Sequence, residues 1–259
     1  MGPGDAEQLA RAISGGAGLD RVTAMIARVD RSAPSIEDMI GSLDELASGA
    51  SDGSTTGLLR YVFSTLGFAG NIDRYYLPSN SLLHRVLDTR LGNPLSLSII
   101  TSELSRRLGG RMCVVGFPGH VLIGDDEEHP TRWFDPFLGG AGMDLAGCRS
   151  LLARMRPGEA FHPSMVRPST PTETAERILN NLDIAYRQTG DLGPLADVAE
   201  LRLGLPAAGN GERRQLAHIL ITTGRVFRAA EVLEDLIASD PANGSEYQAI
   251  RHRLLAQRN

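Results

Sequence analysis

The stretch from Gly92 to Phe137 constrains the fold of this chain most, because a helical pattern runs directly into a β-hairpin pattern. Asn93 is a favoured N-cap residue, and Pro94 suits the first helical position, which needs no N–H donor. Apolar residues then recur at helical spacing, at Leu97, Ile100, Leu104 and Leu108, and a Gly-Gly pair ends the run. The pattern predicts a buried helix with Ser96 in its first turn.

A β-hairpin is predicted to follow this helix. Its strands are the apolar runs 112–117 and 121–123 and a return strand from Trp133, and its tip is the acidic segment 125–128. A turn centred near residues 127–128 would place His120 opposite Asp135 on neighbouring strands. A histidine and a carboxylate in this arrangement are what an oriented general base requires. A core histidine satisfied by a carboxylate is the structural alternative, and the pattern does not separate the two.

Ser96 has two interpretations at this stage. As the third helical residue it lies near free backbone N–H groups and the positive end of the helix dipole, where an anion or a developing oxyanion is favoured. Asn93 and Leu95 belong to the same helix start and would contribute to such an oxyanion site. The alternative is a plain capping role, which is common for serine near a helix N-terminus.

Five short motifs carry a resemblance to a known family. They are GFAGN (67–71), N-S-L-L-x-x-V-L (80–87), R-L-G-N-P-L-S-L (90–97), GFPGH (116–120) and FDPF (134–137). Together they resemble the SirB1 family, which pairs a transglutaminase-like domain with tetratricopeptide-like helices. The resemblance implies an α+β fold: a transglutaminase-like, papain-like core of a helix and an antiparallel sheet, with N-terminal helices before it and a tetratricopeptide-like helical domain after it.

The resemblance also implies a site, with one departure. The superfamily triad is Cys, His and Asp, and His120 and Asp135 match its last two members. Where the cysteine is expected, this chain has Ser96, with Ser98 as the fallback position. We therefore expect a non-catalytic protein-interaction or regulatory module. The alternative is a serine-dependent acyl transferase, amidase or peptidase-like hydrolase that uses a Ser-His-Asp set.

The net charge, the apolar runs and the cysteine spacing of the chain disfavour several classes of function. The net charge of −5 disfavours a general role in binding nucleic acid or anionic membranes. No run of 18 apolar residues and no signal-peptide pattern is present, so a soluble cytoplasmic protein is expected. No phosphate loop or zinc pattern predicts a cofactor or metal, and Cys113 and Cys148 have neither metal nor disulfide spacing. Ligands for a metal are conceivable at residues 125–129, although a charged hairpin tip is usually just solvated.

The domain organisation follows from composition and repeats. We expect a partly flexible N-terminal segment (1–34), a SirB1/transglutaminase-like domain (35–156), an extended proline-rich linker (157–171) and a tetratricopeptide-like helical domain (172–259). Gly190 and Gly224 are 34 residues apart, a spacing typical of tetratricopeptide units. By analogy, the C-terminal helices would bind a protein or peptide partner.

Overall fold

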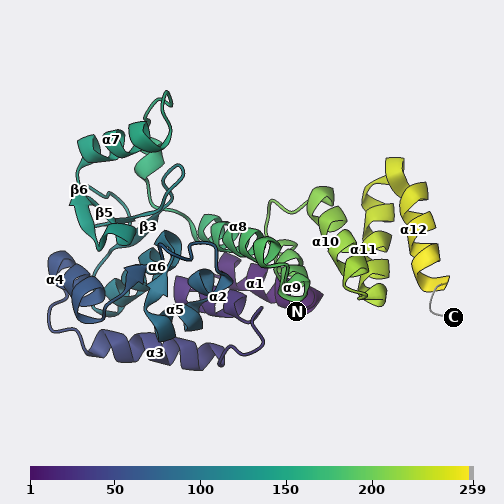
Figure 1. The fold of residues 1–259 in the computed structure, drawn as a ribbon, viewed down its shortest axis with the longest axis horizontal. Coiled ribbons are helices and arrows are strands. Elements are labelled where there is room, and N and C mark those ends of the chain that lie inside the picture. Colours follow the sequence, from purple (N-terminus) through teal and green to yellow (C-terminus); the bar gives the residue numbers. More distant parts are fainter. Residues whose placement is uncertain (257–259) are drawn as a thin grey trace. The chain divides into compact units, whose positions relative to one another are not determined.

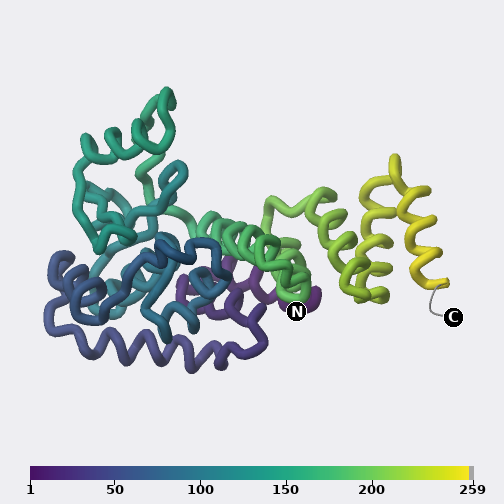
Figure 2. The backbone as a smooth tube through the Cα atoms, viewed as in Figure 1, coloured from purple at the N-terminus to yellow at the C-terminus, as the bar shows by residue number. Residues whose placement is uncertain are grey.

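A computed structural model of the chain describes residues 1–256 (Figures 1 and 2). These residues form two compact units. The core unit is Gly16–Asn181, and the helical unit combines Met1–Gly15 with the chain from Leu182 onward. The predicted boundaries, at residue 34 and across residues 157–171, lie elsewhere, because the first helix groups with the C-terminal helices and the proline-rich segment packs within the core unit.

The core unit contains the predicted helix after Asn93 and several others. They are α2 (Leu19–Ala27), α3 (Ile36–Ser48), α4 (Thr55–Arg60) with a π-helical turn (Tyr61–Thr65), α5 (Leu83–Thr89), α6 (Pro94–Arg107) and α7 (Leu145–Met155), with 3₁₀ turns at Pro78–Ser81, Pro136–Leu138 and Pro163–Val166. Helix α6 is central: it contacts α2, α3 and α4 as well as β3 (Cys113–Val115) and β4 (Leu122–Gly124). Most of its side chains are buried, which explains its apolar spacing.

The hairpin is part of an antiparallel sheet in the order β3-β4-β5-β6, with β5 at Trp133–Asp135 and β6 at Ala141–Met143. The predicted register is wrong, because Ile123 pairs with Phe134. Continuing that register puts Asp135 opposite residue 122, while His120 lies in the turn before β4. Two further short strands, β1 (Ala69–Gly70) and β2 (Leu91–Gly92), form a parallel pair. The α+β class is confirmed.

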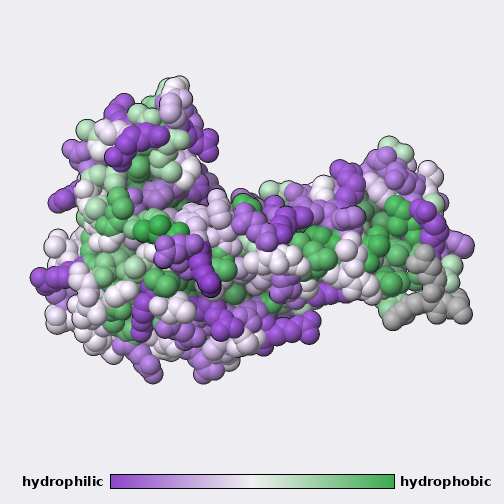
Figure 3. All heavy atoms as spheres, in the orientation of Figure 1, coloured by the Kyte–Doolittle hydropathy of each residue, from purple (hydrophilic) through white to green (hydrophobic). Residues whose placement is uncertain are grey.

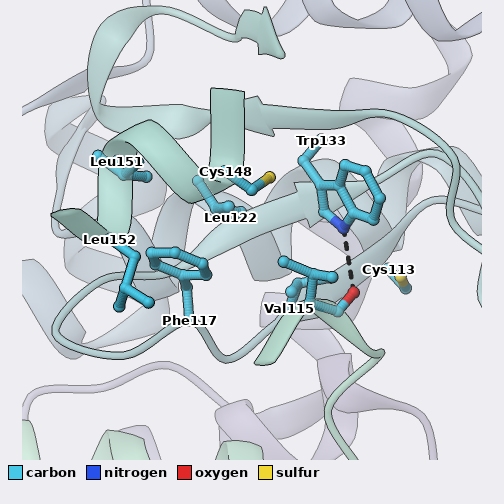
Figure 4. Close-up of a cluster of buried hydrophobic side chains, with 9 residues drawn as sticks. Cys113, Val115, Phe117, Leu122, Trp133, Cys148, Leu151 and Leu152 are labelled. Carbon is cyan, nitrogen blue, oxygen red and sulfur yellow. Dashed lines mark hydrogen bonds between the residues drawn. The ribbon is translucent and has the colours of Figure 1, made fainter. Parts of the chain in front are cut away.

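The proline-rich segment is packed against the sheet and is not an extended linker. Figure 4 shows a cluster of buried side chains contributed by the sheet and α7, which are Cys113, Val115, Phe117, Leu122, Trp133, Cys148, Leu151 and Leu152. Val166 completes this cluster, and its carbonyl accepts a hydrogen bond of 3.0 Å from Trp133 Nε1. The Ser169 N–H donates to the Val114 carbonyl at 2.8 Å. Prolines alone could not reveal these contacts.

The helical unit contains α1 (Pro3–Ser14), α9 (Leu192–Arg202), α10 (Asn210–Thr222), α11 (Val226–Ser239) and α12 (Gly244–Ala256), together with the last residues of α8 (Pro171–Thr189). Helix α1 packs on α9 with Leu9 fully buried. Figure 3 shows apolar side chains at the surface over α11, where Phe227 is 65% exposed. The last three residues of the predicted helical domain, 257–259, lie outside the described residues. Within residues 1–256, no helix has both the length and the apolar character needed to cross a bilayer.

One ion-pair cluster joins α5 to the loop after α2 and makes stability depend on pH. Asp30 accepts bonds from Ser32, from Arg85 Nε at 3.0 Å and lies 3.2 Å from His84 Nε2. Burial raises the pKa of Asp30, but these hydrogen bonds outweigh it and bring the pKa down to about 2. A lowered carboxyl pKa contributes stability above its unfolded value, near 4, and that contribution is lost as the pH falls toward 2.

We predict that Asp30→Asn lowers the free energy of unfolding at pH 7 by about 1–3 kcal/mol, because charge-assisted bonds are lost at a partly buried site. The deficit relative to the wild type should shrink between pH 4 and pH 2, where the wild-type carboxylate is itself neutralised. Urea unfolding across this pH range measures both quantities. A deficit that stays constant down to pH 2 would contradict the ionic role of Asp30.

Candidate functional site

The start of α6 is held by a reciprocal cap between Asn93 and Ser96. Asn93 Oδ1 accepts a bond from the Ser96 N–H at 2.9 Å, and Ser96 Oγ accepts one from the Asn93 N–H at 3.1 Å. The Ser96 hydroxyl donates to the Asn80 carbonyl at 2.7 Å. Ser96 is buried, so both its donor and its acceptor functions are satisfied within the protein.

This cap belongs to a larger network that joins three of the sequence motifs. Asn80 is fully buried, and its amide donates to the Arg74 and Tyr75 carbonyls at 2.7 and 2.9 Å while its side-chain oxygen accepts from Asn71 at 2.9 Å. The Asn93 amide donates to Ser81 Oγ at 2.7 Å. The network therefore fixes the loop that carries Tyr75 relative to the first turn of α6.

A close approach at Gly92 supports the same arrangement. A Cβ at this position would lie 2.5 Å from Ser96 Oγ and 3.1 Å from Val86, so a side chain would displace the capping hydroxyl. Gly92 belongs to β2, and its carbonyl accepts from the Asn71 N–H at 2.9 Å. The glycine in the G-N-P-L-S-L motif is thus required by the Ser96 cap.

His120 and Asp135 meet in space although the predicted register is wrong. His120 Nε2 lies 3.0 Å from Asp135 Oδ2, the His120 side chain is 13% exposed, and the Asp135 side chain is 5% exposed. The other Asp135 oxygen, Oδ1, accepts from the Phe137 N–H at 2.9 Å and is thereby fixed. The contact arises because the turn before β4 folds His120 over the end of β5.

The geometry of this pair is close but not aligned. Despite the 3.0 Å separation, Nε2 has no hydrogen-bond partner of acceptable angle, because the carboxylate oxygen lies off the direction of the ring N–H. We therefore describe the pair as an electrostatic contact that a small rotation of the imidazole converts into a hydrogen bond. Such loose geometry is usual for unliganded sites that tighten on binding.

A pocket of about 250 Å³ opens beside His120, within the core unit. It is lined by Tyr75, Pro94, Leu95, Gly119, His120, Val121, Arg177, Asn180 and Asn181. The first turn of α6 thus contributes Pro94 and Leu95 to this pocket, whereas Ser96 lines only a second, very small cavity, which Leu95 also borders. Sequence reasoning missed the contribution of α8, because nothing in the helical pattern of residues 171–189 indicated which element it packs against.

The fallback serine and the two cysteines lie away from this pocket. Ser98 is fully buried, and its hydroxyl points to the Leu122 carbonyl at 3.5 Å. Cys113 and Cys148 are buried in the cluster of Figure 4. Burial raises the pKa of the Cys113 thiol to about 12 and that of Cys148 to about 11, which keeps both in the unreactive thiol form.

The aspartates of the acidic hairpin tip accept hydrogen bonds from nearby backbone N–H groups. Asp126 accepts bonds from the Glu128 and His129 N–H groups and from Arg111 Nε at 2.9 Å, and Asp125 accepts from the Thr131 N–H at 2.8 Å. Among residues 1–256, no three His, Cys, Asp or Glu side chains are grouped as metal ligands. These carboxylates hold the wide turn between β4 and β5 together.

We predict that Ser96→Ala lowers the free energy of unfolding by about 1–2 kcal/mol, the usual cost of losing an N-cap interaction, with Asn80 left short of a donor. Ser98→Ala is the matched control: it removes a buried hydroxyl from the same helix with only a 3.5 Å contact, so its effect should be smaller. Chemical denaturation of both variants makes the comparison. An Ser96→Ala variant as stable as the wild type would show that the cap contributes nothing.

Comparison with known proteins agrees with the extent of the core unit. Residues 18–180 match the transglutaminase-like superfamily. The UPF0162 protein of Xylella fastidiosa (strain Temecula1) is 40% identical over 134 residues, which cover 50% of this chain and 48% of that protein. The UPF0162 protein of Pseudomonas aeruginosa is 32% identical over 176 residues, which cover 67% and 63%. Human F-box only protein 21 is 38% identical over 66 residues, which cover 25% of this chain and 10% of that protein.

No solved structure matches the chain. The match spans about half the length of the Xylella relative. Within that unit, the fold, the motif set and the superfamily match agree with one another. The chain belongs to the SirB1 family of transglutaminase-like proteins.

Proposed function

We propose that this protein is a non-catalytic recognition module, in which a transglutaminase-like pocket binds a ligand without reacting with it. One observation carries the proposal: the Ser96 hydroxyl donates to the Asn80 carbonyl at 2.7 Å and accepts from the Asn93 N–H. A serine nucleophile has to donate to its general base. Among the described residues, Ser96 has no hydrogen bond to His120.

The residues that do flank His120 at the helix start support the same proposal. Pro94 and Leu95 line the pocket with the imidazole, and neither side chain has a nucleophilic atom. The two thiols of the chain are buried and protonated. The pocket therefore keeps a His-Asp contact, but the residues that the first turn of α6 contributes to its lining carry no nucleophile.

The wider role that we propose is protein interaction or regulation. The helices α9 to α12 would bind a protein or peptide partner, by analogy with tetratricopeptide-like arrays. We also propose a cytoplasmic location. Its support is that both cysteines are unpaired and buried, as is usual in a reducing compartment.

The second candidate is an acyl transferase or amidase that uses Ser96, His120 and Asp135. The observation in its favour is the 3.0 Å contact between His120 and Asp135, which could orient a base. For this activity the Ser96 hydroxyl would have to leave the Asn80 carbonyl, which would keep only the Asn93 N–H as a donor, at 3.2 Å.

We predict that Leu95→Cys creates a reactive thiol, because position 95 combines the pocket, the imidazole and the positive end of α6, all of which favour a thiolate. Its alkylation by iodoacetamide at pH 7 should be about tenfold or more faster than in Leu95→Cys/His120→Ala, measured by peptide mass spectrometry. Ser96→Cys is the matched control and should react slowly, because Ser96 does not line the pocket beside His120 and its side chain is held in the helix cap.

Equal reactivity of Leu95→Cys and Ser96→Cys would contradict this account of the site. For the second candidate, the test is a fluorophosphonate probe on the wild type and on Ser96→Ala. We expect no labelling of either protein. Labelling of the wild type that disappears in Ser96→Ala, with the variant still folded, would overturn the non-catalytic proposal in favour of the hydrolase.

A further inference from the structure

Arg177 on α8 places a cation at the pocket without an acidic partner. Its Nη1 donates to the His120 carbonyl at 2.9 Å and its Nη2 to the Phe117 carbonyl at 3.2 Å, and both acceptors are neutral. In residues 1–256 no carboxylate forms an ion pair with it. Glu173, one turn earlier, is committed to Arg167 and to the Thr170 N–H.

The backbone beside Arg177 leaves space for its guanidinium group. A Cβ at Gly116 would lie 3.3 Å from Arg177 Cζ, so the glycine leaves room for the guanidinium against the backbone. Burial lowers the pKa of Arg177, with Glu173 only partly opposing this. The fold therefore holds a partly desolvated guanidinium with two of its five N–H donors used, a state that an anion would stabilise.

The rest of the pocket complements a carboxylate attached to a small apolar group. His120, Asn180 and Asn181 add polar groups to the wall that Arg177 forms, and none of the lining residues is acidic. The apolar part of the lining comes from Pro94, Leu95, Val121 and the ring of Tyr75. The start of α6, a 14-residue helix, adds the positive end of its dipole to the pocket. A volume of about 250 Å³ suits one or two amino-acid residues.

We propose that this pocket binds the free C-terminal carboxylate of a peptide whose last side chain is apolar, with Arg177 as the main anion contact. The proposal deepens the proposed function, since it names the ligand of a pocket that binds without reacting. An Arg fork with amide donors is the usual protein solution for a carboxylate. The apolar wall receives the terminal side chain, and the pocket mouth admits the preceding chain.

The first experiment compares ligands on the unmodified protein. The probes are acetyl-Ala-Ala-Ala-Leu with a free carboxylate, the same peptide as its C-terminal amide, and N-acetyl-leucine, titrated by NMR or calorimetry. We expect the acid peptide to bind about tenfold or more tightly than the amide, because a charge-assisted fork is lost. Equal affinity for acid and amide, or no binding of the acid at millimolar concentration, overturns the proposal. If N-acetyl-leucine binds as tightly as the peptide, the pocket is a carboxylate site, but its ligand need not be a peptide, and that part of the proposal is rejected.

The second experiment assigns the contact to α8. Arg177→Gln should weaken the acid peptide about tenfold or more and leave the amide unchanged. Because Arg177 also holds two carbonyls, Asn181→Asp provides an independent variant: it keeps those bonds and adds a repelling charge to the lining. Arg60→Gln, an exposed arginine on α4 outside the pocket, is the charge-matched control and should bind like the wild type. Unchanged acid binding in Asn181→Asp would overturn the placement.

The outcomes separate this inference from the proposed function. Fast alkylation of Leu95→Cys with no preference for the acid peptide would retain the non-catalytic pocket and reject its carboxylate specificity. Fluorophosphonate labelling at Ser96 together with acid-specific binding would retain the carboxylate site and reject the non-catalytic role.

Discussion

The hydrogen bond from the Ser96 hydroxyl to the Asn80 carbonyl is the interaction on which the rest of the core unit depends. It couples the first turn of α6 to the loop that carries Tyr75, and Gly92 is the residue that leaves space for it. Both ends are buried, so losing this bond would leave the Asn80 carbonyl with only the longer 3.2 Å bond from the Asn93 N–H. The motif residues around it are best explained as parts of this one hydrogen-bond network.

That hydrogen-bond network limits the chemistry available to the site. A hydroxyl that completes a buried cap is not free to transfer its proton to an imidazole, and rotating it outward would break two bonds at once. The thiol of a transglutaminase-like enzyme has to face the imidazole, and here the residues at the helix start that line the pocket are Pro94 and Leu95. The position facing His120 and the position that caps the helix are thus different residues of one turn.

The sequence predicts the local parts of this arrangement and not the long-range ones. Asn93 as the N-cap and Pro94 as the first helical residue follow from short-range rules, whereas His120 and Asp135 meet through a turn and not through the predicted register. The register fails because the Asp125 and Asp126 carboxylates bind backbone N–H groups and widen the tip, which no alternation pattern encodes. The identity of the capping hydroxyl's acceptor and the approach of Arg177 depend on packing between segments 16 and 60 residues apart.

Arg177 shows why the pocket has to be understood as a unit. Its guanidinium fixes the carbonyls of Phe117 and His120, so the turn that presents the imidazole is held by a side chain from α8. A purely structural arginine would be better served by a carboxylate partner, since neutral carbonyls do not offset the desolvation of a cation. Arg177 therefore has two roles: it positions the turn that carries His120, and it presents a positive charge to the pocket. A ligand carboxylate would stabilise both the cation and the turn. Binding and local order are coupled in this geometry, because the group that recognises the ligand also holds the wall of its pocket.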